Sequence, residues 1–386
     1  SVYSQNISWN FVQEIGGGNY EFPISIMYDQ HGDILHTGSY ASNPLYLNGD
    51  SLALGINDPF GETSHSYIVK YNTSGGKSTP SYNWSKSVTG SGSVYLYGTH
   101  LTDANNYLTF GEFFDDTVSY DGIETFYRKG DENFFLANLD TAGNINWSKV
   151  LGVKSDSIAT SLEAAQYLVD SLGNIYLSGF FKGDSLDLGG GYLTGSGNDL
   201  DQVYLTKYDQ AGNFQWAFTD SSYNDSYGGT QSRRIVKDQN NNIILTGILP
   251  EPARTVIGPD TLSSSGSYDI FMAKIDDMGN PIAAFSIGGV ADELIRGLRI
   301  DNNNDIYVLL TSQSDTFSVD GQLLDNTSST EAQVYLLKFS NSGSLLWHKD
   351  LGNPDPYNVG SWRLKINDQN EVYAVSGFAN YSMTRG

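Results

Sequence analysis

Short stretches of alternating hydrophobic and polar residues recur along the whole chain, separated by turns rich in Asp, Asn and Gly. In residues 203–208 the side chains alternate between two faces, as they do along a β-strand. Residues 209–213 follow and include Gly212, which can adopt the positive φ of a hairpin turn. This pattern predicts β-hairpins throughout, and only residues 161–167 read as a short helix-like run.

The strand–turn–strand pattern around Lys207 occurs five times. Its equivalent positions lie 64 to 69 residues apart and are Lys70, Asn138, Lys207, Lys274 and Lys338. A fixed period of this size is typical of repeat architectures. Each repeat also has a second hairpin signature, an Asp or Asn followed by polar turn residues and an aliphatic strand, at residues 29–38, 170–179, 238–247, 301–308 and 367–373. Four strands per repeat predict an all-β protein, a β-propeller in which each repeat forms one blade.

A variable insert between the two hairpins contains a small hydrophobic hairpin of its own. The clearest example is residues 186–193, and residues 45–52, 256–262 and 317–323 are related to it. We therefore expect about six to seven four-stranded blades with an extra small hairpin per blade. The insert explains why the period exceeds the roughly 40–50 residues of compact propeller blades.

Two places depart from the pattern. Only 10 residues separate Trp84 from Val94, whereas 28 separate Trp147 from Ile175, so the second blade is expected to lack most of its first strand or to form it irregularly. Residues 7–11 resemble an outermost strand without its own blade, and the sequence stops after a sixth inner hairpin. We expect the N-terminal strand to close the ring with the last blade, residues 5–386 to form one propeller domain, and a C-terminal part to be missing.

Composition narrows the range of partners. The formal net charge is −23, with 21 basic and 44 acidic residues, so the surface repels phosphate backbones and anionic membranes. Nucleic acid and direct membrane insertion are therefore not expected. Cysteine is absent, which excludes a disulfide scaffold and a thiolate metal site. Residues 1–4 look like the remnant of a bacterial signal peptide cut before Gln5, although an arbitrary start of the sequence would look the same.

The repeated strand–turn–strand pattern resembles the bacterial β-propeller repeats known as SBBP repeats. The resemblance rests on the run from Lys207 to Asp209, the Gly212–Asn213 turn and Trp216, with Trp147 and Trp347 at the equivalent position of other repeats. It extends over about the whole chain and implies a propeller in a secreted or surface protein, without a shared catalytic site.

A second resemblance concerns modification. Asp followed by Ser or Thr and an aliphatic residue is similar to the O-glycosylation signal of gliding bacteria that use the type 9 secretion system. The candidate acceptors are Ser51, Thr117, Thr141, Ser157, Ser171, Ser185 and Thr261. Asp-Ser and Asp-Thr are also ordinary turn dipeptides, so both interpretations stay open.

Candidate metal and catalytic residues are few. Asp301, Asn303 and Asp305 space oxygen ligands as calcium loops do, but Ile306 stands where such a loop has Gly, and turn chemistry also explains the run. Calcium is therefore a weak candidate, and no other cofactor is expected. The recurring Trp residues are expected to pack between blades, and no catalytic set stands out among the five histidines and 44 acidic residues.

The sequence favours a non-catalytic, secreted or cell-surface propeller that binds a protein or glycan partner through its loops. One alternative is a secreted enzyme, a hydrolase or lyase acting on polysaccharide at the propeller axis. The other is a glycosylated spacer in a larger surface protein. Buried acids at the axis would favour the enzyme, and exposed aromatic residues on one rim would favour binding.

Overall fold

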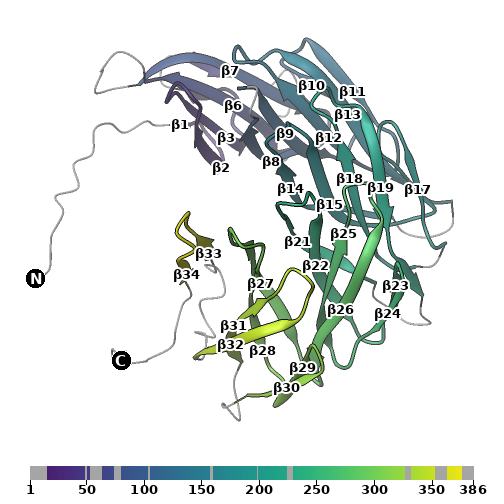
Figure 1. Cartoon of the computed structure of the whole chain (residues 1–386). Coiled ribbons are helices and arrows are strands. Elements are labelled where there is room, and N and C mark those ends of the chain that lie inside the picture. The colour runs from purple at the N-terminus through teal and green to yellow at the C-terminus, as the bar shows by residue number, and fades with distance from the viewer. Residues whose placement is uncertain are drawn as a thin grey trace, which may run out of the picture.

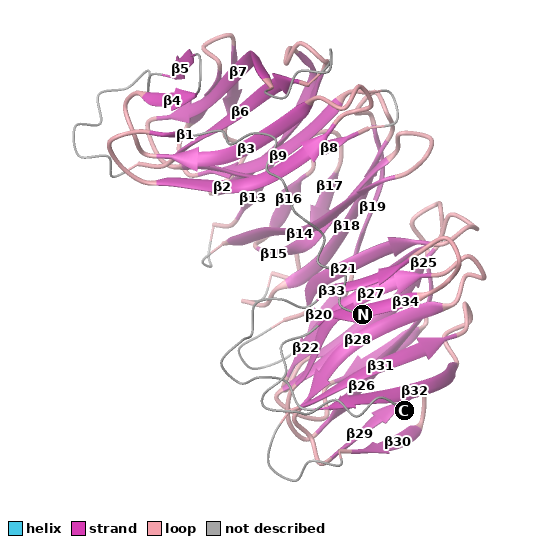
Figure 2. Cartoon of the chain, turned by 90° about the vertical axis from the view of Figure 1, so that its left-hand side faces the viewer, coloured by secondary structure: helices cyan, strands magenta, loops and turns pink. Residues whose placement is uncertain are grey.

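The computed structural model describes residues 15–47, 50–52, 63–73, 80–102, 105–156, 160–197, 199–223, 229–326, 332–352 and 363–375. All regular secondary structure in these ranges is β-strand, and all strand pairs are antiparallel (Figure 2). The all-β prediction is confirmed. Residues 161–167 belong to β14 (Ser161–Val169), so the helix-like interpretation of this run was wrong. Pairing of β14 along its whole length with β15 overrides the helical preference of its Ala and Glu residues.

Five sets of four hydrogen-bonded strands follow one another along the chain, and we call each set a blade. Their strands are, in order, β2 (Glu21–Tyr28), β3 (Ile34–Tyr40), β6 (His65–Asn72) and β7 (Ser81–Gly90); β8 (Val94–Leu101), β9 (Tyr107–Phe113), β12 (Glu132–Leu139) and β13 (Ile145–Lys154); β14, β15 (Ile175–Lys182), β18 (Gln202–Tyr208) and β19 (Phe214–Thr219); β21 (Gln231–Lys237), β22 (Ile243–Pro250), β25 (Tyr268–Ile275) and β26 (Pro281–Gly289); β27 (Glu293–Ile300), β28 (Ile306–Ser312), β31 (Gln333–Phe339) and β32 (Leu345–Gly352). β33 (Arg363–Ile366) and β34 (Val372–Val375) form a sixth, two-stranded unit.

The predicted extra hairpins are present. They are β4 (Leu45–Leu47) with β5 (Asp50–Leu52), β10 (Thr117–Tyr120) with β11 (Glu124–Tyr127), β16 (Ser185–Asp187) with β17 (Tyr192–Thr194), β23 (Arg254–Ile257) with β24 (Asp260–Ser263), and β29 (Thr316–Val319) with β30 (Gln322–Asp325). Their pairing partner was not predicted. β10, β16 and β29 pair with β7, β13 and β26, which are the outer strands of the preceding blades. Each of these hairpins therefore extends the sheet of its neighbour.

The other two hairpins follow the same rule. β23 pairs with β20 (Ser221–Tyr223), which directly follows the outer strand β19. β4 pairs with β1 (Ile15–Gly16). β1 therefore pairs with the first hairpin in the way that the outer strand of a preceding blade pairs with the later hairpins. The predicted strand at residues 7–11 lies outside the described residues.

The second blade is complete, and the prediction that it had lost its first strand was wrong. β8 runs from Val94 to Leu101 and pairs with β9 over its length. The spacing was misleading because Val94 begins β8, the first strand of its blade, whereas Ile175 begins β15, the second strand of the following blade. The two distances therefore did not end at equivalent positions.

The blades are arranged around a common centre. Figure 1 shows the first strands β2, β8, β14, β21, β27 and β33 in this order around it, and the ring is open between β33–β34 and β2. Four pairs of neighbouring first strands touch: β2 with β8, β14 with β21, β21 with β27, and β27 with β33. No helix in the described residues is long and apolar enough to cross a membrane.

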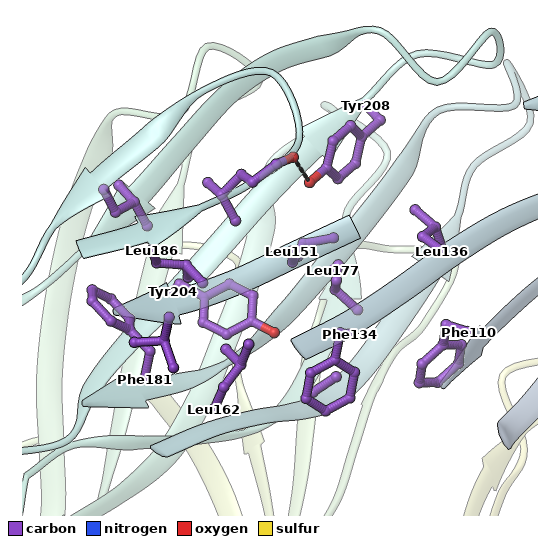
Figure 3. Packing of buried hydrophobic residues seen from close by; sticks show 14 of the residues in the cluster. Phe110, Phe134, Leu136, Leu151, Leu162, Leu177, Phe181, Leu186, Tyr204 and Tyr208 are labelled. Carbon is purple, nitrogen blue, oxygen red and sulfur yellow. Dashed lines mark hydrogen bonds between the residues drawn. The ribbon is translucent and has the colours of Figure 1, made fainter. Parts of the chain in front are cut away.

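The hydrophobic core lies between the blades. One cluster joins the second and third blades through Phe134, Leu151, Phe181 and Tyr204, and the hairpin residue Leu186 is part of it (Figure 3). These side chains come from opposite faces of neighbouring sheets, as the alternating pattern predicts. Similar clusters fill the interfaces between the other blades, so each blade is stabilised mainly by its two neighbours.

Candidate functional site

The Asp residues that begin the inner turns have a structural role in the blades. The Asp29 carboxylate accepts backbone N–H bonds from His31 and Asp33, both at 2.9 Å. The same two bonds recur at the turns that begin with Asp170, Asp238 and Asp301. Such bonds fix the turn that joins the two innermost strands, and this explains the repetition of Asp at one position of the repeat.

A lysine of the third strand pairs with this carboxylate in three blades. Lys70 Nζ lies 2.8 Å from Asp29 Oδ2, and both side chains are buried. The equivalent pairs are Lys274 with Asp238 and Lys338 with Asp301, each at 3.4 Å. Burial alone would raise the pKa of Asp29, but hydrogen bonds from Lys70, Tyr107 and two backbone amides outweigh it and hold that pKa below its usual range.

In the third blade the equivalent Asp and Lys do not pair with each other, and each pairs with a residue of the fourth blade. Asp170 pairs with Lys237 of β21 at 2.7 Å, and Lys207 reaches Asp277, in the outer turn of the fourth blade, at 2.5 Å. The lysines that mark the repeat period therefore connect strands and blades.

The weak calcium candidate lies within one of these ion pairs. Lys338 Nζ is 2.8 Å from Asp305 Oδ2 and 3.4 Å from Asp301 Oδ2, so an ammonium already neutralises two of the three predicted ligands. Asn303 contributes its backbone N–H to the Asp301 carboxylate. A calcium ion would have to displace Lys338. Among the described residues, no group of three or more His, Asp or Glu side chains is placed to hold a metal ion.

The recurring Trp residues pack between blades, as predicted. Trp84, Trp147 and Trp216 each donate Nε1–H to a carbonyl in the outer turn of the next blade, at 2.9–3.1 Å. A Gly with positive φ lies under each indole; at Gly212 a Cβ atom would come within 2.6 Å of the Trp147 ring. Trp347 remains 41% exposed, and Trp9 and Trp362 lie outside the described residues.

The fourth blade lacks this Trp. Ala283 stands opposite Lys274, where the register of the other blades places Trp84, Trp147, Trp216 and Trp347. An apolar cavity of about 220 Å³ lies there, lined by Ala283, Phe285 and Gly343 among others. The cavity lies beside the position that an indole occupies at the other interfaces, and Phe285 lies against Gly343 in its place.

A groove of about 490 Å³ runs along the outer rim between the hairpins β10–β11 and β16–β17. Tyr127 stands on one wall and Tyr192 on the other, 67% and 73% exposed. The groove exists because both hairpins extend the outer edges of the preceding blades. Its polar groups are held in place: Ser148 Oγ donates to Glu124 Oε1 at 2.7 Å, and Tyr192 OH donates to Asp187 Oδ2 at 3.2 Å.

The first strand of each complete blade has a β-bulge at one shared position. The register shifts between Pro23 and Ser25 in β2, Leu96 and Gly98 in β8, Ala164 and Gln166 in β14, Ser232 and Arg234 in β21, and Ile295 and Gly297 in β27. Bulges redirect side chains and are common next to functional sites. In β2 and β8 the extra residues are Ile24 and Tyr97, and in β21 and β27 they are Arg233 and Arg296, so the bulges of the first two blades carry apolar residues and those of the fourth and fifth blades carry basic ones.

The second and third blades supply aromatic side chains to the inner strands. Tyr97 stacks against Phe110 and Phe134 with ring centroids 5.8 and 5.7 Å apart, and Tyr167 meets His100 edge to face. Burial raises the pKa of Glu112, and a hydrogen bond with Tyr97 offsets part of that rise.

The candidate acceptors for O-glycosylation lie at several kinds of position. Ser51, Thr141, Ser171 and Thr261 are exposed, while Thr117 and Ser185 are half-buried. Ser51, Thr117, Ser185 and Thr261 belong to the extra hairpins, and Thr141 and Ser171 lie in turns. Ser157 lies outside the described residues. Glycosylation stays a prediction.

Two features of the site were missed in the sequence. The groove was missed because a hairpin's partner strand lies about one repeat away, and sequence spacing does not reveal which sheet it joins. The group of arginines on β21, β27 and β33 was visible as Arg233–Arg234, Arg296, Arg299 and Arg363, each within eight residues before an inner turn. Only the structure shows that these strands are neighbours.

One relative among the known proteins agrees with this repeat geometry. No protein-family model matches the chain. An uncharacterized WD repeat-containing protein of Acanthamoeba polyphaga mimivirus is 22% identical over 386 aligned residues, which cover 85% of this chain and 27% of that protein. The chain is a β-propeller-like repeat protein. It spans only about a quarter of the length of this relative.

Among solved structures, this propeller-like chain is similar to a protein of unknown function from Bacteroides caccae. The two share 10% sequence identity with a TM-score of 0.27, over 74% of this chain and 89% of that one. The blade number of about six to seven, the bacterial SBBP type of the repeat and its link to type 9 secretion stay predictions.

Proposed function

We propose that this chain is a non-catalytic interaction module of a secreted or cell-surface protein, and that it binds a protein or glycan partner. The observation that carries the proposal is the rim groove between β11 and β17, with Tyr127 and Tyr192 exposed on facing walls. Large exposed aromatic residues beside a hollow are typical of binding surfaces. WD-repeat proteins generally mediate protein interactions, which supports the same class of function.

The chemistry of the groove suits a carbohydrate chain. A tyrosine offers a flat apolar face for a sugar ring and a hydroxyl that stays in water. Glu124 and Asp187 add carboxylate oxygens that can accept hydrogen bonds from sugar hydroxyl groups. Ser148 and Tyr192 hold these carboxylates in place before a ligand arrives, which reduces the entropy lost on binding.

The test is binding of soluble neutral and acidic polysaccharides by calorimetry to the wild type and to the Tyr127→Ala/Tyr192→Ala variant. Loss of two stacking platforms is expected to weaken binding at least tenfold, or about 1.4 kcal/mol. Tyr46→Ala is the control, because Tyr46 is 60% exposed on β4 of another extra hairpin and does not line the groove. Equal losses in both variants would contradict the groove as the site.

The alternatives predict different results in the same samples. Shortened polysaccharide chains after incubation would favour the enzyme at the axis. Absence of binding, with glycans on Ser51, Thr261 or Ser185, would favour the spacer. Mass spectrometry of protein from its native host tests secretion as well: Gln5 as the N-terminal residue is expected, and retention of Ser1 would contradict the signal-peptide interpretation.

A further inference from the structure

The inner strands of the ring fall into two groups of different chemistry. β2, β8 and β14 contain no Lys or Arg. β21, β27 and β33 contain five arginines, Arg233, Arg234, Arg296, Arg299 and Arg363. The whole sequence has only eight arginines and a net charge of −23, so this group stands out against a strongly acidic protein.

These arginines come from neighbouring strands. β21 touches β27, and β27 touches β33, and Figure 2 shows the three strands side by side. Burial lowers the pKa of Arg234, and the charges of Arg299, Arg233 and Arg363 lower it further. Burial and Arg363 lower the pKa of Arg299 in the same way. Arg234 and Arg299 are half-buried and Arg363 is exposed, and the strands that carry them touch, so these guanidinium groups belong to one region of like charge.

Two of these guanidinium groups lack an acidic partner. Among the described residues, neither Arg234 nor Arg299 forms a salt bridge with a carboxylate; each donates to a neighbouring backbone carbonyl, at 2.8 and 2.6 Å. Arg233 differs, since it lies 3.8 Å from Glu163. A guanidinium has five N–H donors, so most donors of Arg234 and Arg299 are not used by these bonds.

We propose that Arg234 and Arg299, with Arg296 and Arg363 beside them, bind a multivalent oxyanion, a phosphate or sulfate group, at the centre of the ring. The planar fork of each guanidinium matches two oxygens of such a group, and a multivalent anion relieves the repulsion between several like charges at once. Half-buried cations gathered without a ligand destabilise a fold, which gives a physical reason to expect one. The proposal does not depend on the rim groove.

A hollow of about 630 Å³ gives access to these strands. Gln231 and Arg233 of β21 and Leu294 of β27 line it, and the connecting segments supply Glu251 and Asp292. The two acids make the entrance itself unsuitable for an anion. The site is therefore assigned to Arg234 and Arg299, further along the same two strands.

The experiment titrates the full chain with inorganic pyrophosphate by calorimetry at low ionic strength, with sodium chloride at equal ionic strength as the reference. We expect saturable binding of pyrophosphate and none of chloride. Arg234→Gln/Arg299→Gln should weaken the affinity at least about tenfold, because charge-assisted bonds to two guanidiniums are lost. Equal heats for pyrophosphate and chloride in the wild type would overturn the proposal.

The matched control is Arg128→Gln/Arg254→Gln, which removes the same charge from two exposed arginines on other parts of the chain. We expect its affinity to stay within about twofold of the wild type, since screened surface charges contribute little. Similar losses in both double variants would overturn the site, because overall charge would then explain binding. Urea unfolding without anion guards against misfolding: the Arg234→Gln/Arg299→Gln variant should be at least as stable as the wild type, since it relieves repulsion.

A second titration distinguishes the source of the anion. A sulfated disaccharide replaces pyrophosphate, and both ligands are tested on the same variants. Tighter binding of pyrophosphate would assign the site to phosphate, and tighter binding of the disaccharide would assign it to a sulfate ester on a glycan. Either result supports the oxyanion site only if Arg234 and Arg299 are required; binding that survives their replacement would contradict it.

Discussion

The first and second blades differ at the turn between their two innermost strands. In the first blade Asp29 begins this turn, and its carboxylate is paired with Lys70 of the third strand. In the second blade Thr102 and Asn138 stand at these positions, and both are buried. The backbone bonds are the same: Asp29 N donates to Asp33 O at 2.9 Å, and Thr102 N donates to Asn106 O at 2.8 Å.

The comparison shows that the turn and the charges are separable. Thr102 Oγ1 accepts the backbone N–H of Asn106, as the Asp29 carboxylate accepts that of Asp33. Acid and base are absent together from the second blade, which avoids a buried charge without a partner. The ion pair is therefore one of two compatible ways to fill the same space.

The largest expected effect comes from breaking the pair in the first blade. Lys70→Met leaves the buried Asp29 and the nearby Asp33 without their cation, and should lower the free energy of unfolding by about 3–5 kcal/mol. Urea unfolding followed by tryptophan fluorescence measures it. Lys154→Met, at an exposed position, is the control and should change stability by less than about 0.5 kcal/mol.

The reverse change should be smaller. Asn138→Lys places a cation in the second blade with no acid at position 102, and should lower stability by about 1–3 kcal/mol. A lysine side chain is long enough to reach toward water, so part of the cost is avoided. Adding Thr102→Asp should restore most of the loss; a double variant no more stable than the single one would show that the blades are not equivalent at this site.

Converting the first blade to the second blade's arrangement should have a still smaller effect. Asp29→Thr, Asp33→Asn and Lys70→Asn together reproduce Thr102, Asn106 and Asn138, and stability at neutral pH should stay within about 1 kcal/mol of the wild type. The same urea experiment tests it. A loss as large as that of Lys70→Met would mean that the charges themselves hold the turn.

The smallest expected effect is the change with pH of the stability difference between the wild type and the triple variant. The pKa of Asp29 is lower in the folded than in the unfolded chain, so its contribution to stability is present above about pH 4 and is lost as pH falls below it. Any advantage of the wild type over the triple variant should therefore shrink as the pH is lowered from about 4 to about 2. An advantage that stays constant over that range would show that Asp29 does not contribute through its charge.

Much of the fold was predictable because the pattern is local and repeated. The Asp turns, the Gly at positive φ and the Trp above it all lie within one repeat or one repeat apart, so their spacing is visible in the sequence. The packing role of Trp84, Trp147 and Trp216 is confirmed for the same reason.

The errors came from connections and partners. The short distance between Trp84 and Val94 was taken as loss of a strand, but Val94 begins the first strand of its blade and not the second. The helix-like run at residues 161–167 forms a strand because it pairs with β15. The rim groove depends on a hairpin that joins a neighbouring sheet, and the arginine cluster depends on three strands from different blades. Non-local pairing of this kind is not encoded in a residue period.

The exchange of hairpins between blades also affects how the protein avoids aggregation. An uncovered outer strand offers unpaired N–H and C=O groups to any other chain. Here β10, β16 and β29 cover β7, β13 and β26, so each repeat protects the edge of the repeat before it. A chain cut between two repeats would keep a whole four-stranded blade but expose its edge, and shortened versions should fail by association before they fail by unfolding.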